Sequence, residues 1–319
     1  MIETSPGGAQ DSAFCSQAVN VSSLLQNSFR YCRRLARARA RNFYYGFLLL
    51  PKPRRGALCA VYAFMRYCDD VADGEASASE KAIRLEQWHQ ALDRALAGDY
   101  GDSLIWPAFH HAVRQYSIPS QYLHDLITGT EMDLSIRSYR TFEDLYQYCY
   151  RVASVVGLCS LHILGFRDPA AKKLAEECGI AFQLTNILRD LREDAHNGRI
   201  YLPLEDLELF HYSAEELTAG VYNPQFRELM RFEMERASRF YERAYPLIAL
   251  VEPESRPALW TLISIYHGIL RSMERNAGNV FARAAGLTEM EKINLLLQAA
   301  RMRFRARAGR EPEWQRLRG

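Results

Sequence analysis

The amino-acid sequence predicts an all-α protein. Proline is absent from long windows, such as those between Pro53 and Pro107 and between Pro119 and Pro169. Proline breaks the interior of a helix at a cost of about 3 kcal/mol, so windows of this kind that are rich in Ala, Leu, Arg, Glu and Gln favour helices. No Asn-Gly or Asp-Gly pair joins two alternating apolar runs, so the strand signal is weak.

Proline and glycine divide the chain into successive helices. The first ends before Pro51, and the second begins at Pro53 and ends before Gly74. Residues 57–65 and 152–164 are apolar on more than one helical face, which places them inside a large bundle. We expect helices at residues 22–48, 53–73, 79–97, 100–116, 120–134, 141–164, 169–197, 203–207, 213–219, 224–250, 257–276 and 288–308.

Length and charge predict a single domain and give no general reason for nucleic-acid binding. The chain has 319 residues, and 40 Lys and Arg side chains against 38 Asp and Glu give a formal net charge of +2. A net charge this small provides no general electrostatic reason to bind nucleic acid. No repeat or linker divides the sequence, so we expect a single domain over residues 22–300, with a disordered tail over 1–21 and a basic tail over 301–319.

Cysteine content and hydropathy predict a cytoplasmic protein. The seven cysteines are odd in number and include no Cys-x-x-Cys pair, which argues for a reducing compartment. The first 20 residues lack the basic start and apolar run of a signal peptide. The longest apolar stretches, residues 43–50 and 152–166, are shorter than the ~20 residues that cross a bilayer.

The first candidate site lies in Arg66-Tyr-Cys-Asp69-Asp70-Val-Ala-Asp73. On a helix Asp69 and Asp73 lie one turn apart and point the same way, while Asp70 lies about 100° round. Like charges at this spacing repel by a few tenths of a kcal/mol, so we expect a cation to compensate them. Taken alone, the motif is explained as well by a solvated acidic turn before Gly74.

A second cluster favours the cation. Asn186, Asp190 and Asp194 recur at every fourth position and form one stripe of oxygen-bearing side chains on a predicted helix. Oxygen ligands without His or Cys suit a hard ion, and Mg²⁺ combines a few carboxylates with the phosphate oxygens of a substrate. Two such stripes facing each other predict Mg²⁺ ions, with Mn²⁺ as a substitute, around a diphosphate.

Five segments resemble the squalene/phytoene synthase family, which condenses prenyl diphosphates head to head. The similarity extends from about Arg41 to Arg283 and rests on FYYGFLLLPKPRR (43–55), YAFMRYCDDVAD (62–73), YCYRVASVVG (148–157), AFQLTNILRDLREDAHNGRIYLP (181–203) and ISIYHGILRSMERNAGNVFAR (263–283). The resemblance implies a single-domain class I isoprenoid synthase bundle with a central cavity for two prenyl diphosphate molecules.

The resemblance also implies roles for individual residues. Tyr148 corresponds to a tyrosine that assists proton removal or orients the leaving diphosphate. The implied catalytic residues are Tyr148, Asp69, Asp73, Asp190 and Asp194, and the implied metal ligands are Asp69, Asp70, Asp73, Asn186, Asp190 and Asp194. The implied substrate-binding residues hold phosphates or line the hydrocarbon tunnel: Arg41, Phe43, Phe47, Tyr62, Arg66, Val152, Val156, Gly157, Gln183, Arg189, Tyr201, Tyr266 and Arg283.

Some of these positions have a plainer explanation. Arg41 closes a basic run over residues 30–41, which a solvated helix face explains as well. A buried tyrosine is more often a hydrogen-bonded core residue than a catalytic one. The family usually has glycine where this chain has Ser154, so we expect an additional hydroxyl where the helix passes close to the substrate.

The predicted activity is Mg²⁺-dependent 1′–1 condensation of two identical allylic prenyl diphosphates through a cyclopropylcarbinyl diphosphate. C15 units give presqualene diphosphate or squalene, and squalene requires a hydride donor such as NADPH. C20 units give phytoene, and the motifs do not separate the two chain lengths. The alternatives are a class I terpene cyclase or a head-to-tail prenyltransferase, which the segments GRIYLP and YCYRVA disfavour, and a non-catalytic relative, which the intact acidic residues disfavour.

The C-terminal segment suggests a membrane contact. Residues 301–310 interleave arginines with apolar side chains, which suits an anionic membrane surface. A solvated chain end explains the same pattern. The sequence does not predict the oligomeric state.

Overall fold

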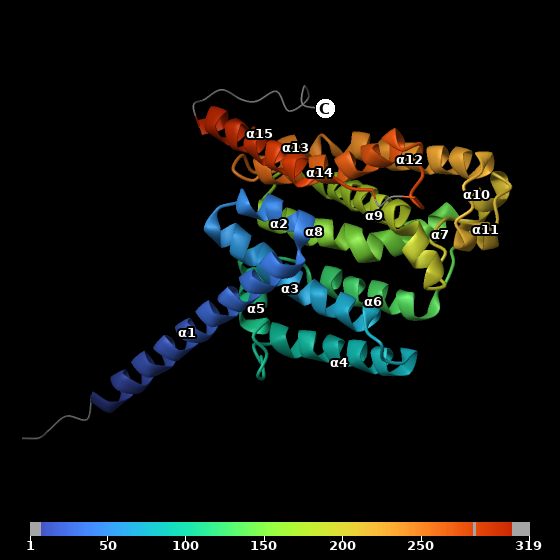
Figure 1. Ribbon diagram of the computed structural model, residues 1–319. Helices are drawn as coiled ribbons and strands as arrows, with labels where there is room; N and C mark the ends of the chain where they lie inside the picture. Colours follow the sequence, from blue (N-terminus) through green and yellow to red (C-terminus); the bar gives the residue numbers. More distant parts are fainter. Residues whose placement is uncertain (1–7, 283–284, 308–319) are drawn as a thin grey trace, which may run out of the picture.

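The computed structural model describes residues 8–282 and 285–307 as a bundle of helices (Figure 1). In chain order the helices are α1 (Gly8–Arg39), α2 (Arg41–Leu48), α3 (Lys52–Asp73), α4 (Ala78–Leu96), α5 (Trp106–Gln115), α6 (Ser120–Ser135), α7 (Phe142–Cys149), η1 (Tyr150–Ser154), α8 (Val155–Leu164), α9 (Ala170–His196), α10 (Leu204–Leu209), α11 (Ala214–Ala219), α12 (Pro224–Ala244), α13 (Leu247–Leu250), α14 (Arg256–Arg275) and α15 (Glu289–Arg307). Over these residues the strand-like contacts are two isolated bridges, Ser138 with Ile200 and Phe166 with Val251. The all-α prediction is confirmed.

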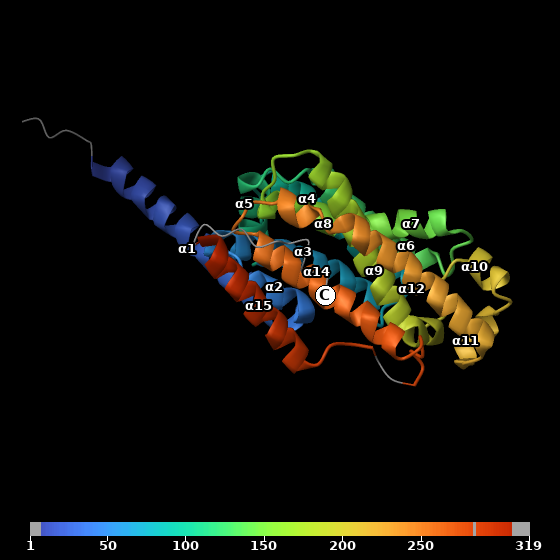
Figure 2. The same ribbon diagram turned by 90° about the horizontal axis from the view of Figure 1, so that it is seen from above.

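The long helix α9 lies in the middle of the bundle in both views (Figures 1 and 2). It packs against α8, α12, α14 and the short helix η1. Its sequence suits this place, because small and apolar side chains such as Gly179, Ala181 and Leu188 are buried on several of its faces. The buried apolar side chains from Cys32 to Met302 form one continuous core.

The helix expected near the chain's start has different bounds in the structure, whereas the one expected near its end, over residues 288–308, agrees with α15 (Glu289–Arg307). The helix expected over residues 22–48 is divided into α1 and α2, and α1 begins at Gly8. The first turns of α1 extend away from the bundle in both views (Figures 1 and 2). At the other end α15 continues past residue 300 to Arg307. The division into a domain and two tails stays a prediction.

Two other expected helices are interrupted. The helix expected over residues 224–250 is α12 followed by α13, because Pro246 cannot donate the backbone hydrogen bond that a continuous helix needs. The helix expected over residues 141–164 contains η1, a π-helical segment between α7 and α8. Such a segment widens the helix locally and is frequent at functional sites.

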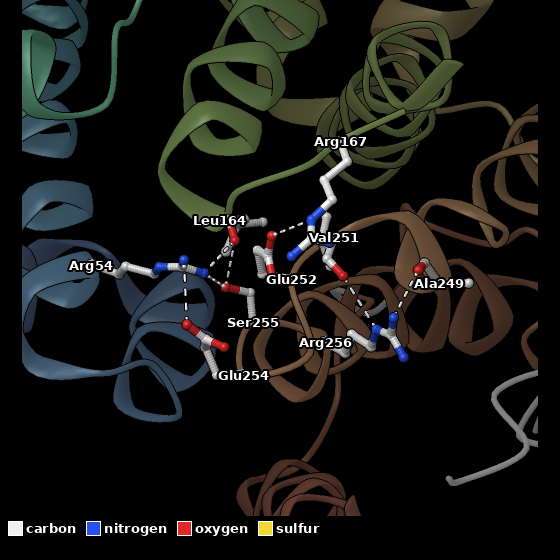
Figure 3. Close-up of polar contacts among 9 residues, drawn as sticks. All are labelled: Arg54, Leu164, Arg167, Ala249, Val251, Glu252, Glu254, Ser255 and Arg256. Atoms are coloured by element: carbon white, nitrogen blue, oxygen red, sulfur yellow. Dashed lines mark hydrogen bonds and ion pairs between the residues drawn. The ribbon is translucent and has the colours of Figure 1, made fainter. Parts of the chain in front are cut away.

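Arg54 joins three elements at one end of the bundle (Figure 3). Its Nη1 donates to the backbone oxygen of Leu164 at 2.5 Å and to Oγ of Ser255 at 2.6 Å. Its Nη2 pairs with Glu254 at 3.3 Å. Leu164 is the last residue of α8, so the guanidinium satisfies a carbonyl that a helix C-terminus leaves without an intrahelical partner.

The structure also bears on the membrane. Among the helices of the described residues, none combines the length and hydropathy of a membrane span.

Candidate active site

The first aspartate motif occupies the last two turns of α3. Arg66 donates to Oδ1 of Asp70 from Nε at 2.8 Å and from Nη2 at 2.5 Å, and its Nη1 lies 3.7 Å from Oδ2 of Asp69. Arg39 of α1 adds a second contact to Oδ1 of Asp70, at 3.1 Å. Asp70 is therefore held by two guanidinium groups, whereas Asp69 and Asp73 lie one turn apart on the neighbouring part of the helix surface.

Asp69 is exposed, but the protein around it perturbs its carboxylate. Its side chain is 57% exposed, yet the surrounding protein desolvates the carboxylate enough to raise its pKa to about 6. Arg66 opposes this rise, and the negative charges of Asp73, Asp70 and Asp133 add to it. A cation would stabilise this carboxylate, because its positive charge offsets both the desolvation and the repulsion from the neighbouring carboxylates.

The second motif lies on α9. Arg189 binds Asp190 with both arms of its guanidinium, at 2.8 and 2.6 Å. Desolvation raises the pKa of Asp194 to about 7, the charge of Asp190 raises it further, and Arg199 opposes the rise. Asn186 donates to Oε1 of Gln183 at 3.4 Å, and its own Oδ1 is buried without a hydrogen-bond partner.

Asp133, near the end of α6, links the two motifs. Its charge raises the pKa of Asp69 on α3 and of Asp194 on α9, so the structure brings both stripes to one site. Its Oδ1 accepts a hydrogen bond from Tyr201 at 2.8 Å, and its Oδ2 accepts one from Tyr148 at 3.2 Å. Burial raises the pKa of Asp133 itself. Asp133 was not among the predicted site residues, since a single Asp on a helix carries no repeated spacing.

The predicted tyrosines near Asp133 form a stacked group. Tyr148 is 3% exposed, and its ring lies 5.3 Å from that of Tyr201 and 5.3 Å from that of Tyr139. Burial raises the pKa of Tyr148, so the phenol is neutral and its hydroxyl is a donor. The buried Nε of Arg199 has no hydrogen-bond partner, and the negative charges of Tyr201 and Asp133 act to raise the pKa of its guanidinium. Arg199 lies in the GRIYLP segment but was not among the predicted site residues.

Aromatic side chains from three helices form a wall beside Asp190. Tyr266 of α14 stacks on Phe182 of α9 with centroids 4.3 Å apart, and Phe43 of α2 lies 5.2 Å from Tyr266. The charges of Arg189 and Asp190 reach the Tyr266 hydroxyl. Phe43 and Tyr266, which were predicted to bind substrate, are thus neighbours.

Other predicted positions lie around this wall. Burial raises the pKa of Tyr62 to about 12, and the charges of Arg66 and Asp69 also reach this hydroxyl, so Tyr62 lies beside the first motif. Phe47 is buried, while Val152 and Val156 are half-buried. The side chain of Arg41 and all of Arg283 lie outside the residues whose structure is described.

Ser154 and Gly157 contact α9. The Ser154 side chain is completely buried, and its hydroxyl donates to the backbone oxygen of Glu176 at 2.8 Å, so this additional hydroxyl already has a partner on α9. A methyl group added at Gly157 would lie 3.0 Å from the backbone oxygen of Ala175. Both residues keep η1 and α8 close to α9, because small side chains let helices approach.

The donor set fits Mg²⁺. Across the described residues, no three His, Cys, Asp or Glu side chains come close enough to hold a metal ion by themselves. Mg²⁺ commonly takes one or two carboxylates and completes its octahedron with water and substrate phosphates. Asp69, Asp73, Asp190 and Asp194 supply only oxygen ligands, and the buried, unpartnered Oδ1 of Asn186 is an additional one.

Comparison with known proteins shows which protein family this chain resembles. The sequence profile of the squalene/phytoene synthase family matches residues 36–291. The phytoene synthase of Arthrospira platensis is 38% identical over 88% of this chain and 94% of that protein, and the 15-cis-phytoene synthase of Synechococcus elongatus is 37% identical over 84% and 91%. The crystal structure of a dehydrosqualene synthase superimposes with a TM-score of 0.80 at 29% identity, covering 87% of this chain and 96% of that one.

A squalene synthase from Alicyclobacillus acidocaldarius also superimposes, with a TM-score of 0.75 at 29% identity over 80% of this chain and 96% of that one. The chain therefore belongs to the squalene/phytoene synthase family and has the all-α isoprenoid synthase fold. It is a prenyltransferase that condenses prenyl diphosphates head to head.

Proposed function

We propose that this enzyme converts two C20 prenyl diphosphates into phytoene. The observation that carries the choice of C20 over C15 is that the similar curated proteins from cyanobacteria, plants and Mycobacterium bovis bear the name phytoene synthase. The motifs themselves are compatible with both chain lengths. A phytoene synthase needs no NADPH, because the final cation loses a proton and no hydride is added.

We also propose which residues act on the first diphosphate. Asp69, Asp73, Asn186, Asp190 and Asp194 would hold Mg²⁺, which would supply the positive charge that makes the diphosphate a leaving group. Arg66 and Arg189 extend their forked donors from the same two helices and suit phosphate oxygens. Because Arg66 and Arg189 already pair with the neighbouring carboxylates, their guanidinium groups are oriented before substrate binds.

The tyrosine group supports the next step. Departure of the diphosphate leaves an allylic cation, which the C2–C3 double bond of the second substrate attacks, and loss of a proton closes the cyclopropane ring. Burial keeps the Tyr148 phenol neutral, which disfavours its role as a base and leaves orienting the leaving diphosphate as the role we propose. Tyr201 and Asp133 hold the Tyr148 hydroxyl in place. Departure of the second diphosphate, rearrangement and loss of another proton then give phytoene.

The experiment that tests this function compares the two substrates. Purified enzyme receives Mg²⁺ with either geranylgeranyl or farnesyl diphosphate, with and without NADPH, and the hydrocarbons are identified by mass spectrometry. We expect phytoene from the C20 substrate at a rate that NADPH does not change. A C30 hydrocarbon as the main product would refute the C20 assignment, and a cyclised product from a single substrate molecule would support a terpene cyclase.

We further propose that α15 contacts membranes from the cytoplasmic side. Met290, Ile293, Leu297 and Phe304 recur at helical spacing and are 80%, 50%, 54% and 79% exposed, so they form one apolar face. Arg301 lies exposed on the same helix. An apolar face with basic neighbours suits an anionic lipid surface, which is also where the long hydrocarbon product dissolves. The rest of the basic tail, from residue 308, lies outside the described residues.

Vesicle sedimentation tests this contact. We expect Met290→Gln with Phe304→Gln to reduce binding to vesicles of phosphatidylglycerol and phosphatidylcholine. Ile83→Gln on α4, which removes a side chain that is 58% exposed, is the matched control and leaves binding unchanged. Equal binding of all three proteins would exclude α15 as the contact.

A further inference from the structure

A cavity of about 260 Å³ lies between α14 and α15 and shares no lining residue with the predicted active site. Its polar wall includes Arg271, Arg275, Asn294 and Gln298, and its apolar wall includes Trp260 and Leu295. Trp260, Arg271 and Arg275 are separated by eleven and four residues on α14, and Asn294, Leu295 and Gln298 lie within about one turn of α15, so each helix offers one face. Helix α14 therefore contributes to two sites, since Tyr266 lies in the aromatic wall beside Asp190.

The cavity has an excess of positive charge. Arg271 is half-buried and forms no ion pair with any described acidic residue. Arg275 pairs with Glu291 at 3.8 Å, but both side chains are largely exposed, so this pair is weak. The Glu291 carboxylate also accepts hydrogen bonds from the backbone N–H and the hydroxyl of Thr288, at 2.7 and 2.9 Å, at the start of α15. One guanidinium is thus left without a counter-charge.

The remaining titratable group in the wall adds no charge at neutral pH. Burial lowers the pKa of His267 to about 4, and the nearby positive charge of Arg271 contributes to the decrease. The imidazole stacks on Tyr241 with centroids 4.7 Å apart, and its Nδ1 lies 3.2 Å from the hydroxyl of Tyr245. His267 is therefore a fixed neutral part of the wall.

The shape and chemistry of the cavity select a type of ligand. Guanidinium groups bind phosphate through paired donors, and the amides of Asn294 and Gln298 are neutral donors beside them. Trp260 and Leu295 provide an apolar surface for a short carbon group. Its volume of about 260 Å³ is slightly below the roughly 300 Å³ of the smallest typical small-molecule sites, so the ligand is small. We propose that this cavity is an accessory site for a small organic phosphate, held at its phosphate by Arg271 and at its apolar group by Trp260 and Leu295.

Calorimetry without metal tests the proposal separately from catalysis. n-Butyl phosphate is titrated into the full-length enzyme in EDTA, which removes the metal that the active site is proposed to use. We expect saturable binding at one site, and we expect Arg271→Gln to weaken it about tenfold or more, because a charge-assisted hydrogen bond is lost. Arg239→Gln on α12 removes an exposed arginine whose partner Glu235 lies 3.7 Å away, and this control leaves the affinity unchanged.

Two further variants locate the ligand. Leu295→Asn should weaken n-butyl phosphate but not inorganic phosphate, since only the former has an apolar group. Asp69→Asn should change neither affinity, and Arg271→Gln should retain the condensation rate at saturating substrate, which also shows that this variant folds. Absence of saturable binding by the wild type, equal affinity of the Arg271 variant, or loss of binding in the Asp69 variant would overturn the proposal.

Discussion

Gly179 sets the distance between α9 and η1. A methyl group at this position would lie 2.5 Å from Cα and 2.7 Å from the backbone nitrogen of Ser154, and 2.8 Å from the backbone oxygen of Ala153. All three atoms belong to the backbone, so no side-chain rotation can make room. Gly179→Ala must therefore move one helix by roughly 0.9 Å to reach the 3.4 Å of an ordinary contact.

The effect of this substitution can be estimated from its parts. Overpacking a core costs about 1–3 kcal/mol, and alanine recovers up to about 1 kcal/mol through its higher helix propensity. We expect a net loss of about 1–2 kcal/mol in the free energy of unfolding. The displacement also moves the α9 carboxylates relative to Tyr148, and a misplacement of about 1 Å can reduce activity by up to about a hundredfold.

Thermal unfolding and steady-state kinetics measure the two effects. Gly286→Ala is the control, since Gly286 has no heavy atom within 4 Å of the added methyl group and no positive φ. We expect this control to change stability by less than about 1 kcal/mol and to leave activity intact. If Gly179→Ala unfolds at the wild-type temperature and keeps the wild-type kcat/KM, the close packing described here is wrong.

Three further predictions concern Asp133, Arg54 and His267. Asp133→Asn removes the acceptor for one tyrosine hydroxyl and the negative charge between the two aspartate motifs. We expect kcat to decrease about tenfold or more with little change in melting temperature. An unchanged kcat would show that Asp133 does not link the motifs of α3 and α9. Arg54→Met should lower the free energy of unfolding by about 2 kcal/mol in denaturant titrations, since the carbonyl of Leu164 loses its charged donor. Arg167→Met, which removes an arginine side chain that is 90% exposed, is the control. The folded-state pKa of His267 is below its unfolded value of 6.5, so the free energy of unfolding falls as pH decreases from about 6.5 to about 4, by roughly 3 kcal/mol at the acid end. His267→Phe should make the free energy of unfolding less dependent on pH in that window. A pH profile identical to that of the wild type would contradict this prediction.

The sequence predicted those parts of the site that follow a regular spacing. Asp69 with Asp73, and Asn186 with Asp190 and Asp194, could be proposed as site residues because residues four apart share a helical face. Asp133 was missed because its position depends on how α6 packs against α3 and α9, which no local spacing records. The structure then supplied the connection between the two motifs.

The other differences also have physical causes. The absence of a side chain at Gly179 lets the two backbones approach so closely that the Ser154 hydroxyl bonds to Glu176, a contact that no local pattern in the sequence records. The π-helical turn of η1 has no simple sequence signal, because it differs from an α-helix by one residue in a single turn. The break at Pro246 was available in the sequence, since proline interrupts a helix.

The central claim is that the aspartates of α3 and α9 act together on one diphosphate. The most direct test measures the initial rate of inorganic diphosphate release from geranylgeranyl diphosphate with Mg²⁺, in the wild type, Asp69→Asn, Asp190→Asn and the double variant. Asp102→Asn, in the exposed loop between α4 and α5, is the control. We predict that each single variant loses about a hundredfold or more and that the double variant loses little beyond this, because groups that act as a unit are not additive. A wild-type rate in either single variant would contradict the claim.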